Sequence, residues 1–460
     1  MRPIEDLPLS KQIFYAIGQL GWSITVNIIG IQLVYFYAPP ENAGINYYIP
    51  QITFLGFLNL VSILAASGRL FDAITDPLIA GLSDRSKHPK GRRIPFLKWG
   101  AVPTGIFCFL IFFPIVKDVS YLNVIYIFVV QALFFLFLTI YVTPYFALLA
   151  EFPANQRLNL STYISITYAL GIMLASQVPT LANFIKDTFQ IEFTAAIQTA
   201  IGILLIIAIL LMLVPVVTID EKRYCKSEPI EIPIIESLKS TLKNPYFKYY
   251  VIADFSYFAA LTIIMTGLLF YTTVLLFPDN KTKGENLIGV LLPLMILTSF
   301  VLYPVVNLLA KKVGKKSLVV ISYAIMSLVF FNVYFLGEKF YNTIISPEIQ
   351  AFGIVILYSI PLSFVSILPN AILADIAEYD ALETQVPKEA MYFAARTFLQ
   401  KFGQTFGIFI FAILLLFGKD PGNDIGIRMT GLAGFLLSVF STIFFSRYDE
   451  KSVLKRLEKR

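Results

Sequence analysis

The chain alternates long hydrophobic runs with short polar segments. Most runs are about 20 to 30 residues long, enough for a helix to cross the roughly 30 Å hydrocarbon core of a bilayer. Twelve such runs occur, at 12–37, 48–80, 95–116, 121–150, 159–185, 194–217, 247–277, 287–310, 317–337, 349–374, 389–418 and 425–446. Charges interrupt the second, seventh and eleventh, but each completes the alternation of sides across the membrane. Because the backbone in lipid must bond to itself within each segment, the pattern predicts an all-α membrane protein with twelve transmembrane helices.

The twelve runs fall into two groups of six, separated by the longest polar inner segment of the chain. We expect an N-terminal six-helix bundle at 1–217, a cytoplasmic linker at 218–246, a C-terminal six-helix bundle at 247–446 and a basic cytoplasmic tail at 447–460. The loop after the second run reads K-G-R-R, and the loop after the eighth reads V-G-K-K. This short match at corresponding positions favours an internal duplication.

Lysine and arginine are distributed unevenly between the two sets of loops. With the N-terminus placed inside, 26 of the 36 lie in inner segments, seven in outer segments and three within the runs. Cytoplasmic loops of membrane proteins carry such an excess of positive charge. The asymmetry predicts that both termini are cytoplasmic, in a plasma membrane or a bacterial inner membrane.

Composition argues against other classes of protein. The chain is 57% hydrophobic and 14% charged, whereas a soluble domain has about 25% charged residues. Its net charge of +6 follows from the loop asymmetry and does not indicate nucleic acid. Cys108 and Cys225 lie far apart and His88 is the single histidine, so neither a disulfide, a metal cluster nor an enzyme active site is indicated. We expect no cofactor, and a monomer whose partners are its substrate and membrane lipid.

The most informative stretch is 67–93, which begins inside the second run and ends in a basic loop. Arg69, Asp72 and Asp76 lie at positions i, i+3 and i+7, so a helix would place them on one face. Ionisable groups in a membrane helix are costly and usually mark an ion or substrate path. Two neighbouring carboxylates offer oxygen ligands to a small hard cation such as Na⁺ or Li⁺. They could instead share a proton, or Arg69 could neutralise Asp72 as a structural ion pair.

Three stretches carry a likeness to a known family. They are R-L-F-D-A-I-T-D-P-L (69–78) with K-G-R-R-x-P after it, T-P-Y-F-A-L-L-A-E (143–151), and L-A-D-I-A-E-Y-D (373–380) followed by E-A-M-Y-F (389–393). Together they resemble the glycoside–pentoside–hexuronide:cation symporter family of the major facilitator superfamily, which includes melibiose permease. The resemblance covers nearly the whole chain. It implies two pseudo-symmetric six-helix bundles that work by alternating access.

The resemblance also implies roles for individual residues. The second-helix acids that bind the coupling cation in the family fall on Asp72 and Asp76. Neighbouring hydroxyl positions fall on Thr75 and Thr139, and the eleventh-helix lysine near that site falls on Lys401. We therefore expect transport coupled to sodium, lithium or protons.

Three substrate positions depart from sugar permeases of the melibiose type. Their first-helix acid falls on Ser23, the acid before the fourth-helix Pro-aromatic pair falls on Val142, and the fifth-helix arginine falls on Ser165. Phe146 is the aromatic side chain best placed to contact a sugar. These departures disfavour a galactoside. The sodium-dependent lysophosphatidylcholine symporters, a related branch, keep the paired acids and the lysine, so a lysophospholipid is an alternative substrate.

Charge within the runs bears on the substrate. Arg69, Arg396 and Lys401 carry three positive charges, against two negative charges on the acid pair. A bound cation would leave this region positive, which favours an anionic cosubstrate such as a uronic acid or a lipid phosphate. Asp254, in the seventh run, could cancel one of the positive charges.

Further charged residues gather at the inner mouth of the predicted bundles. They are Asp84, Arg85, Arg92, Arg93 and Arg157. We interpret them as gating residues, whose ion pairs would hold the two bundles together when the outer side is open. The alternative is that the basic ones only set topology.

The sequence therefore predicts a cation-coupled symporter of a small organic solute, such as a glycoside or hexuronide, and not an enzyme. A lysophospholipid symporter of the same fold is the first alternative, and a non-transporting receptor or scaffold is the second.

Overall fold

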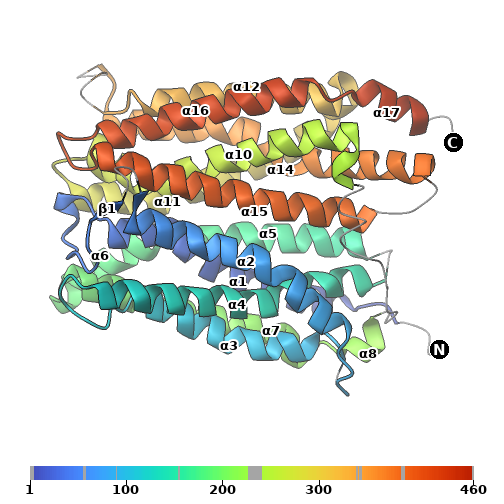
Figure 1. The fold of residues 1–460 in the computed structure, drawn as a ribbon, viewed down its shortest axis with the longest axis horizontal. Coiled ribbons are helices and arrows are strands. Elements are labelled where there is room, and N and C mark those ends of the chain that lie inside the picture. The colour runs from blue at the N-terminus through green and yellow to red at the C-terminus, as the bar shows by residue number, and fades with distance from the viewer. Residues whose placement is uncertain are drawn as a thin grey trace. The chain divides into compact units, whose positions relative to one another are not determined.

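The computed structural model of the chain describes residues 5–54, 58–89, 91–153, 156–225, 241–337, 340, 344–384 and 389–457. Long helices dominate it (Figure 1). Within this part of the chain, eleven helical segments are long and apolar enough to cross a membrane. A further 25-residue helix, α2, carries the ionisable residues of the second run and completes the twelve. The all-α membrane fold predicted from the hydrophobic runs is confirmed.

The N-terminal half follows the predicted order of runs. Its helices are α1 (Leu9–Tyr37), α2 (Leu60–Asp84), α3 (Ile94–Ile111), α4 (Tyr121–Glu151), α5 (Arg157–Ala175), α6 (Val178–Phe189), α7 (Phe193–Thr218) and the short α8 (Glu221–Tyr224). A 3₁₀ turn (Glu41–Ala43) and two strands, β1 (Thr53–Phe54) and β2 (Leu58–Asn59), lie between α1 and α2.

The C-terminal half has the same plan. Its helices are α10 (Pro245–Phe270), which continues as a π-helical turn (Tyr271–Leu276), then α11 (Lys281–Val313), α12 (Lys315–Val333), α14 (Pro347–Thr384), α15 (Glu389–Leu414) with a final 3₁₀ turn (Leu415–Phe417), α16 (Ile425–Ser446) and α17 (Glu450–Leu457).

Several boundaries differ from those of the hydrophobic runs, among them those of the second and fifth runs. The second run begins at 48, but α2 begins at Leu60, because the preceding residues include an antiparallel pair that joins Thr53 to Asn59. Aromatic and β-branched residues there favour extended structure. The fifth run is two helices, α5 and α6, and Pro179 lies in the first turn of α6. Proline has no N–H to continue the preceding helix, which explains the break.

The chain divides into two compact units, residues 1–230 with 281–289, and residues 231–280 with 290–460. In the N-terminal unit, α1 packs against α5 and α7, and α4 packs against α2 and α3. In the C-terminal unit, α10 packs against α15 and α16, and α12 packs against α14 and α16.

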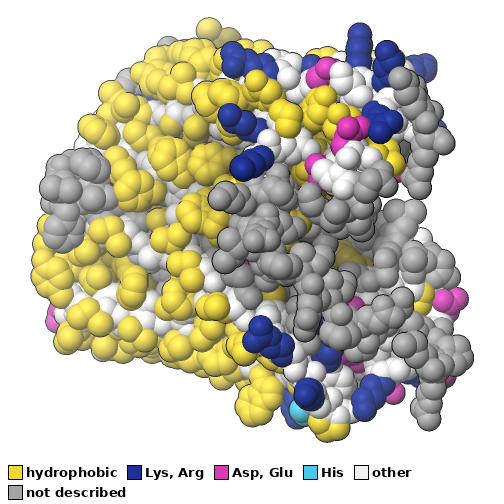
Figure 2. Space-filling model, turned by 45° about the vertical axis from the view of Figure 1, so that its right-hand side comes forward, with side chains coloured by type: hydrophobic (Ala, Val, Ile, Leu, Met, Phe, Trp, Pro, Cys, Tyr) yellow, Lys and Arg dark blue, Asp and Glu magenta, His cyan; other side chains and the backbone are white. Residues whose placement is uncertain are grey.

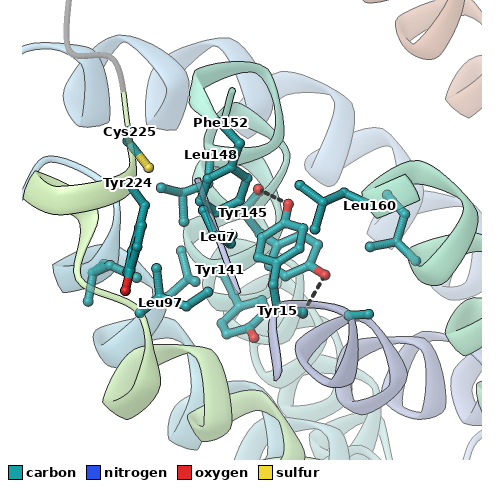
Figure 3. Close-up of a cluster of buried hydrophobic side chains, with 14 of the residues drawn as sticks. Leu7, Tyr15, Leu97, Tyr141, Tyr145, Leu148, Phe152, Leu160, Tyr224 and Cys225 are labelled. Atoms are coloured by element: carbon teal, nitrogen blue, oxygen red, sulfur yellow. Dashed lines mark hydrogen bonds between the residues drawn. The ribbon is translucent and has the colours of Figure 1, made fainter. Parts of the chain in front are cut away.

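A cluster of buried side chains joins α1 to α4 in the N-terminal unit (Figure 3). The rings of Tyr15 and Tyr145 stack with centroids 4.3 Å apart. The Tyr15 hydroxyl donates to the Tyr145 carbonyl at 2.6 Å, and the Tyr145 hydroxyl donates to the Tyr15 carbonyl at 2.8 Å. Tyr141 donates to the Met212 carbonyl in α7. Since each of these buried hydroxyls has a partner, the cluster fixes α4 against α1 and α7.

Hydrophobic side chains cover much of the face shown in Figure 2, while lysine and arginine gather towards one end of it. Large apolar side chains such as Ile206 in α7, Leu308 in α11 and Leu436 in α16 are more than half exposed. A soluble surface rarely exposes so much contiguous apolar area. Such a surface fits contact with lipid.

Candidate cation and substrate site

The acid pair of the second run lies on α2, facing α4. Asp72 is 5% exposed and Asp76 is half-buried, one helical turn further on. The helices α2 and α4 pack against each other. Buried carboxylates are costly unless they are hydrogen-bonded or bind a cation. The groups that α4 presents to them therefore decide what this pair can do.

Two threonines of α4 contact the two carboxylates. Thr139 Oγ1 donates to Asp72 Oδ1 at 2.8 Å, and Thr143 Oγ1 donates to Asp76 Oδ1 at 3.1 Å. Thr75 Oγ1 lies 3.2 Å from Thr139 Oγ1 and 3.1 Å from the Asp72 carbonyl oxygen. The result is a row of carboxylate, hydroxyl and carbonyl oxygens between α2 and α4. Oxygen ligands of this kind suit hard monovalent or divalent cations.

A glycine permits this close approach of the two helices. A Cβ atom on Gly68 of α2 would lie 2.0 Å from Gln131 Nε2 and 2.3 Å from a ring carbon of Phe135, both on α4. Gln131 Nε2 also donates to the Leu64 carbonyl at 2.9 Å. One turn beyond Gly68, the same interface brings Asp72 to Thr139.

The predicted residues Asp72, Thr75 and Thr139 are therefore brought together in the structure, with Asp76 beside them. Thr143 was missed by the sequence reasoning. Its signal was available, because Thr139 and Thr143 are four residues apart on α4 just as Asp72 and Asp76 are on α2. The side chain of Arg69 lies outside the described residues, so its pairing with Asp72 stays a hypothesis.

The three substrate positions that depart from the sugar permeases have ordinary structural contacts. Ser23 is fully buried, and its hydroxyl donates to the Tyr168 carbonyl of α5 at 2.7 Å. Val142 packs against the buried cluster between α1 and α4. Ser165 is exposed, and its hydroxyl donates to the Ser161 carbonyl within α5. Ser23 thus joins α1 to α5, where a carboxylate would leave a buried charge.

Phe146 is the predicted aromatic contact for the solute. It is 41% exposed and lies edge-on to Trp22 of α1, with ring centroids 6.1 Å apart. Trp22 in turn lies 5.6 Å from the ring of Tyr168 on α5. Thr139, Thr143 and Phe146 follow the i, i+4, i+7 spacing, so they share one face of α4. The aromatic group of Phe146, Trp22 and Tyr168 thus lies about one helical turn from the acid pair. Trp22 and Tyr168 were not predicted from the sequence.

Arg396 and Lys401 lie on α15, in the C-terminal unit. Arg396 makes a two-point ion pair with Asp254 of α10, through Nε to Oδ2 at 2.9 Å and Nη2 to Oδ1 at 3.1 Å. Its Nη1 also bonds the Asn370 side chain of α14. Asp254 therefore cancels the charge of Arg396, as the sequence had left open. Lys401 is half-buried five residues further along α15.

Arg92 and Arg93, two of the predicted gating residues, bond within the N-terminal unit. Both pair with Glu151 at the end of α4, at 3.1 and 2.8 Å. Their backbone N–H groups donate to the two carboxylate oxygens of Glu221 in α8. Burial raises the pKa of the Glu151 carboxyl, and Arg93 opposes this shift. Arg85 is exposed. A gating role for these residues stays a prediction.

The side chains of Asp84 and Arg157, the other two predicted gating residues, lie outside the described residues.

The buried acid Glu285 lies in a segment that the hydrophobic pattern had assigned to a loop. The eighth run was predicted to begin at 287, but α11 begins at Lys281, so Glu285 lies inside the helix and is 1% exposed. Lys281, Asn183 and Tyr35 all contact its carboxylate, at 3.2, 3.0 and 3.3 Å. Hydropathy assigned these residues to a loop because it cannot register partners that lie far away in sequence.

In the described part of the chain, two features define the class of protein: twelve membrane helices in two units, and an acid pair at the interface of two of the helices. This is the arrangement of a secondary transporter. The chain also matches the family described as MFS/sugar transport protein over residues 14–442. The protein therefore belongs to that family, and it is a multi-pass membrane transporter rather than an enzyme.

Individual relatives are distant. An Escherichia coli (strain K12) protein named "Putative sulfoquinovose importer" is 24% identical over 427 residues, 89% of this chain and 82% of the relative. "Putative glycoside/cation symporter YagG", also from Escherichia coli (strain K12), is 35% identical over 108 residues, 24% of this chain and 21% of the relative. A crystal structure of a D-xylose-proton symporter aligns with a TM-score of 0.66 at 15% identity, covering 96% of this chain and 98% of that one. At this identity the structural likeness shows the fold alone.

Proposed function

We propose that the protein is a cation-coupled symporter of a small sugar-like solute, a glycoside or a hexuronide. The observation that carries the proposal is the acid pair of α2, whose carboxylates each accept a hydrogen bond from a threonine of α4. A relative named as a glycoside/cation symporter supports coupling to an ion. The lysophospholipid alternative draws no support from the relatives, so the sugar-like solute is preferred.

The acid pair would act as the switch that links ion and solute. Two carboxylates one turn apart on one helix face repel each other when both are ionised. A sodium ion, a lithium ion or a proton relieves this repulsion. If the ion-bound form binds the solute better, each ligand raises the affinity of the other by the same factor. The ion and the solute then cross the membrane only together.

The solute would bind beside the ion, against the aromatic group of Phe146 and Trp22. Their rings offer apolar faces next to the row of oxygens on α4, and ligand sites typically combine such faces with a few polar groups. We assign Lys401 to the same cycle, where it would compete with the cation for the acid pair or hold an acidic group of the solute.

The charge balance supports an anionic solute less strongly than the sequence suggested. Because Arg396 is paired with Asp254, the remaining formal charges of Arg69 and Lys401 match those of the acid pair. One bound monovalent cation then leaves a single positive charge. Neutral glycosides and hexuronates are therefore both candidates.

The test begins with thermal unfolding of the purified protein. Neutral glycosides, hexuronates and lysophosphatidylcholine are each added with sodium, lithium or potassium, at two pH values. We expect one sugar-like ligand to raise the unfolding midpoint strongly only when a particular ion is present. Stabilisation by lysophosphatidylcholine alone would point to the alternative substrate.

Uptake of that ligand into proteoliposomes then tests coupling. Uptake should follow the gradient of the same ion, and Asp76→Asn should abolish this dependence. Asp118→Asn, which alters an exposed acid in the loop before α4, serves as the matched control. Uptake that is unchanged when every ion gradient is dissipated would refute symport.

A further inference from the structure

The C-terminal unit contains an apolar groove that the transport site does not use. It has a volume of about 590 Å³ and is lined by residues of α10, α15 and α16. Its lining residues are Val251, Ile252, Phe255, Ser256, Leu399, Phe406, Leu436, Leu437 and Phe440. The hydroxyl of Ser256 already donates to the Ile252 carbonyl. The groove therefore suits a hydrocarbon chain rather than a polar solute.

The register of α10 and α16 shows what lies above the groove. These helices are antiparallel, because Tyr250 contacts Phe445 and the Ser441 hydroxyl donates to the Ala253 carbonyl at 2.8 Å. In one direction along the pair, residue numbers therefore rise in α10 and fall in α16. The same register places Lys248, near the start of α10, level with Arg447, just past the end of α16.

Both cations lie on the helix faces that form the groove. Lys248, Ile252 and Phe255 follow the i, i+4, i+7 spacing on α10, and Leu436, Phe440 and Arg447 follow i, i+4, i+11 on α16. Lys248 and Arg447 are exposed, and neither has an acidic partner in the described part of the chain. The seven residues from Lys248 to Phe255 correspond to a rise of about 10 Å.

We propose that this groove binds an acyl chain of an anionic phospholipid, whose phosphate is held by Lys248 and Arg447. Along α10, Lys248 lies about 6 Å from Ile252 and about 10 Å from Phe255, as a headgroup lies above the upper part of its chains. Basic sites at the cytoplasmic ends of membrane helices are known to select acidic headgroups. With the predicted orientation, the lipid comes from the cytoplasmic leaflet. The bound chain fills the space between α15 and α16 and stabilises both helices against α10.

The first measurement compares two lipids with identical acyl chains. Purified protein in a neutral detergent receives phosphatidylglycerol or phosphatidylcholine, and bound lipid is counted by native mass spectrometry while thermal unfolding is followed. We expect one phosphatidylglycerol to bind tightly and raise the unfolding midpoint. Phosphatidylcholine should bind weakly, and glycerol phosphate, which has no acyl chains, should do nothing. Equal binding of the two lipids would overturn the proposal.

Two sets of variants test the headgroup site and the acyl-chain site separately. Lys248→Gln with Arg447→Gln should weaken phosphatidylglycerol binding about 25-fold, from about fivefold for each cation. Leu436→Trp should block the groove and also lose the lipid. Lys98→Gln and Leu210→Trp change similarly exposed residues on α3 and α7, and should leave binding unchanged.

Retention of phosphatidylglycerol by Leu436→Trp would refute the groove as the acyl site. Retention by the double cation variant would refute the headgroup site. Because lipid is counted on the protein without any transport assay, either failure is distinguishable from failure of the proposed symport.

Discussion

The two units repeat one framework at the ends of their helices. In the N-terminal unit, Gly91 has a φ of 114° just before α3, and in the C-terminal unit Gly314 has a φ of 90° just before α12. Both values lie in the region that glycine adopts without strain. The helix that follows each glycine receives an acid from the end of its own unit, since Glu221 accepts backbone N–H groups at the start of α3 and Glu450 accepts one at the start of α12.

Ion pairs and tyrosine contacts repeat as well. Arg93 pairs with Glu151 of α4 at 2.8 Å, and Lys315 pairs with Asp375 of α14 at 2.5 Å. Each pair joins the third helix of its unit to the fourth.

A tyrosine of the first helix also reaches the fourth helix in both units. Tyr15 donates to the Tyr145 carbonyl, and Tyr250 donates to the Pro369 carbonyl. Such matched contacts at corresponding places are typical of an internal duplication.

The units differ where the buried charge lies. Counted back from the two loop glycines, Asp72 and Asp76 of α2 correspond to Met295 and Ser299 of α11. The Ser299 hydroxyl only bonds carbonyl oxygens, among them Met295's own. The duplicated framework thus carries an acid pair in one half alone. The contacts that the two halves share position helices. The acid pair that only the first half has would bind the ion.

The largest expected effect comes from giving α2 the residues of α11. The double variant Asp72→Met, Asp76→Ser removes both carboxylates, so ion-dependent uptake into proteoliposomes should fall by at least about 100-fold, as for loss of the charged ligands of a bound ion. Met295→Leu with Ser299→Ala is the matched change in the other half and should retain most of the uptake. Comparable losses in both halves would show that the asymmetry does not matter for coupling.

The next effect concerns the charge of the C-terminal unit. Asp254→Asn leaves the guanidinium of Arg396 buried without its carboxylate, which should lower the free energy of unfolding by about 3–5 kcal/mol. Adding Arg396→Gln removes the orphaned charge and should recover much of the loss. Thermal unfolding of the two variants in one detergent makes the comparison. A single variant no less stable than the double would mean that the pair is not held as the structure shows.

Smaller effects should follow from the threonines of α4. Thr139→Ala removes a hydrogen bond to a charged carboxylate, a contribution of about 1.5–3 kcal/mol, so the ion concentration for half-maximal uptake should change about 10- to 100-fold. Thr139→Ser keeps the hydroxyl and should restore it. Ser363 lies as far before Asp375 as Thr139 lies before Glu151, and its hydroxyl bonds only within α14. If Ser363→Ala had the same effect, the ion site would not be confined to the N-terminal unit.

The sequence predicted the helices and much of the acid site because both depend on local pattern. Hydrophobic runs of sufficient length predict membrane helices whatever their partners are, and Asp72 and Asp76 are anomalous wherever such a run contains them. Thr143 shared the spacing of the acids but was read as the start of a Pro-Tyr motif. Its contact with Asp76 depends on the close approach of α2 and α4, which local pattern does not specify.

The remaining differences arise from partners far away in sequence. Asp254 and Arg396 are 142 residues apart, so no periodicity joins them. Glu285 was assigned to a loop, because Lys281, Lys283 and Glu285 lower the hydropathy there. Its burial depends on Asn183 of α6, whose position is known only once the helices are assembled.

The smallest expected effect distinguishes the two helix caps. Glu221 uses both carboxylate oxygens, one accepting from Arg92 and the other from Arg93 and Ile94, at 2.6 to 2.9 Å. Glutamine would have to turn its NH₂ group towards these donors, so Glu221→Gln should cost about 2 kcal/mol of stability. Glu450 uses one oxygen, which accepts from Lys316 at 3.1 Å, and the glutamine carbonyl can replace it. Glu450→Gln should therefore cost less than about 1 kcal/mol. Equal shifts in the thermal midpoint would contradict this ranking, and would mean that the two caps, like the glycines before them, are equivalent copies.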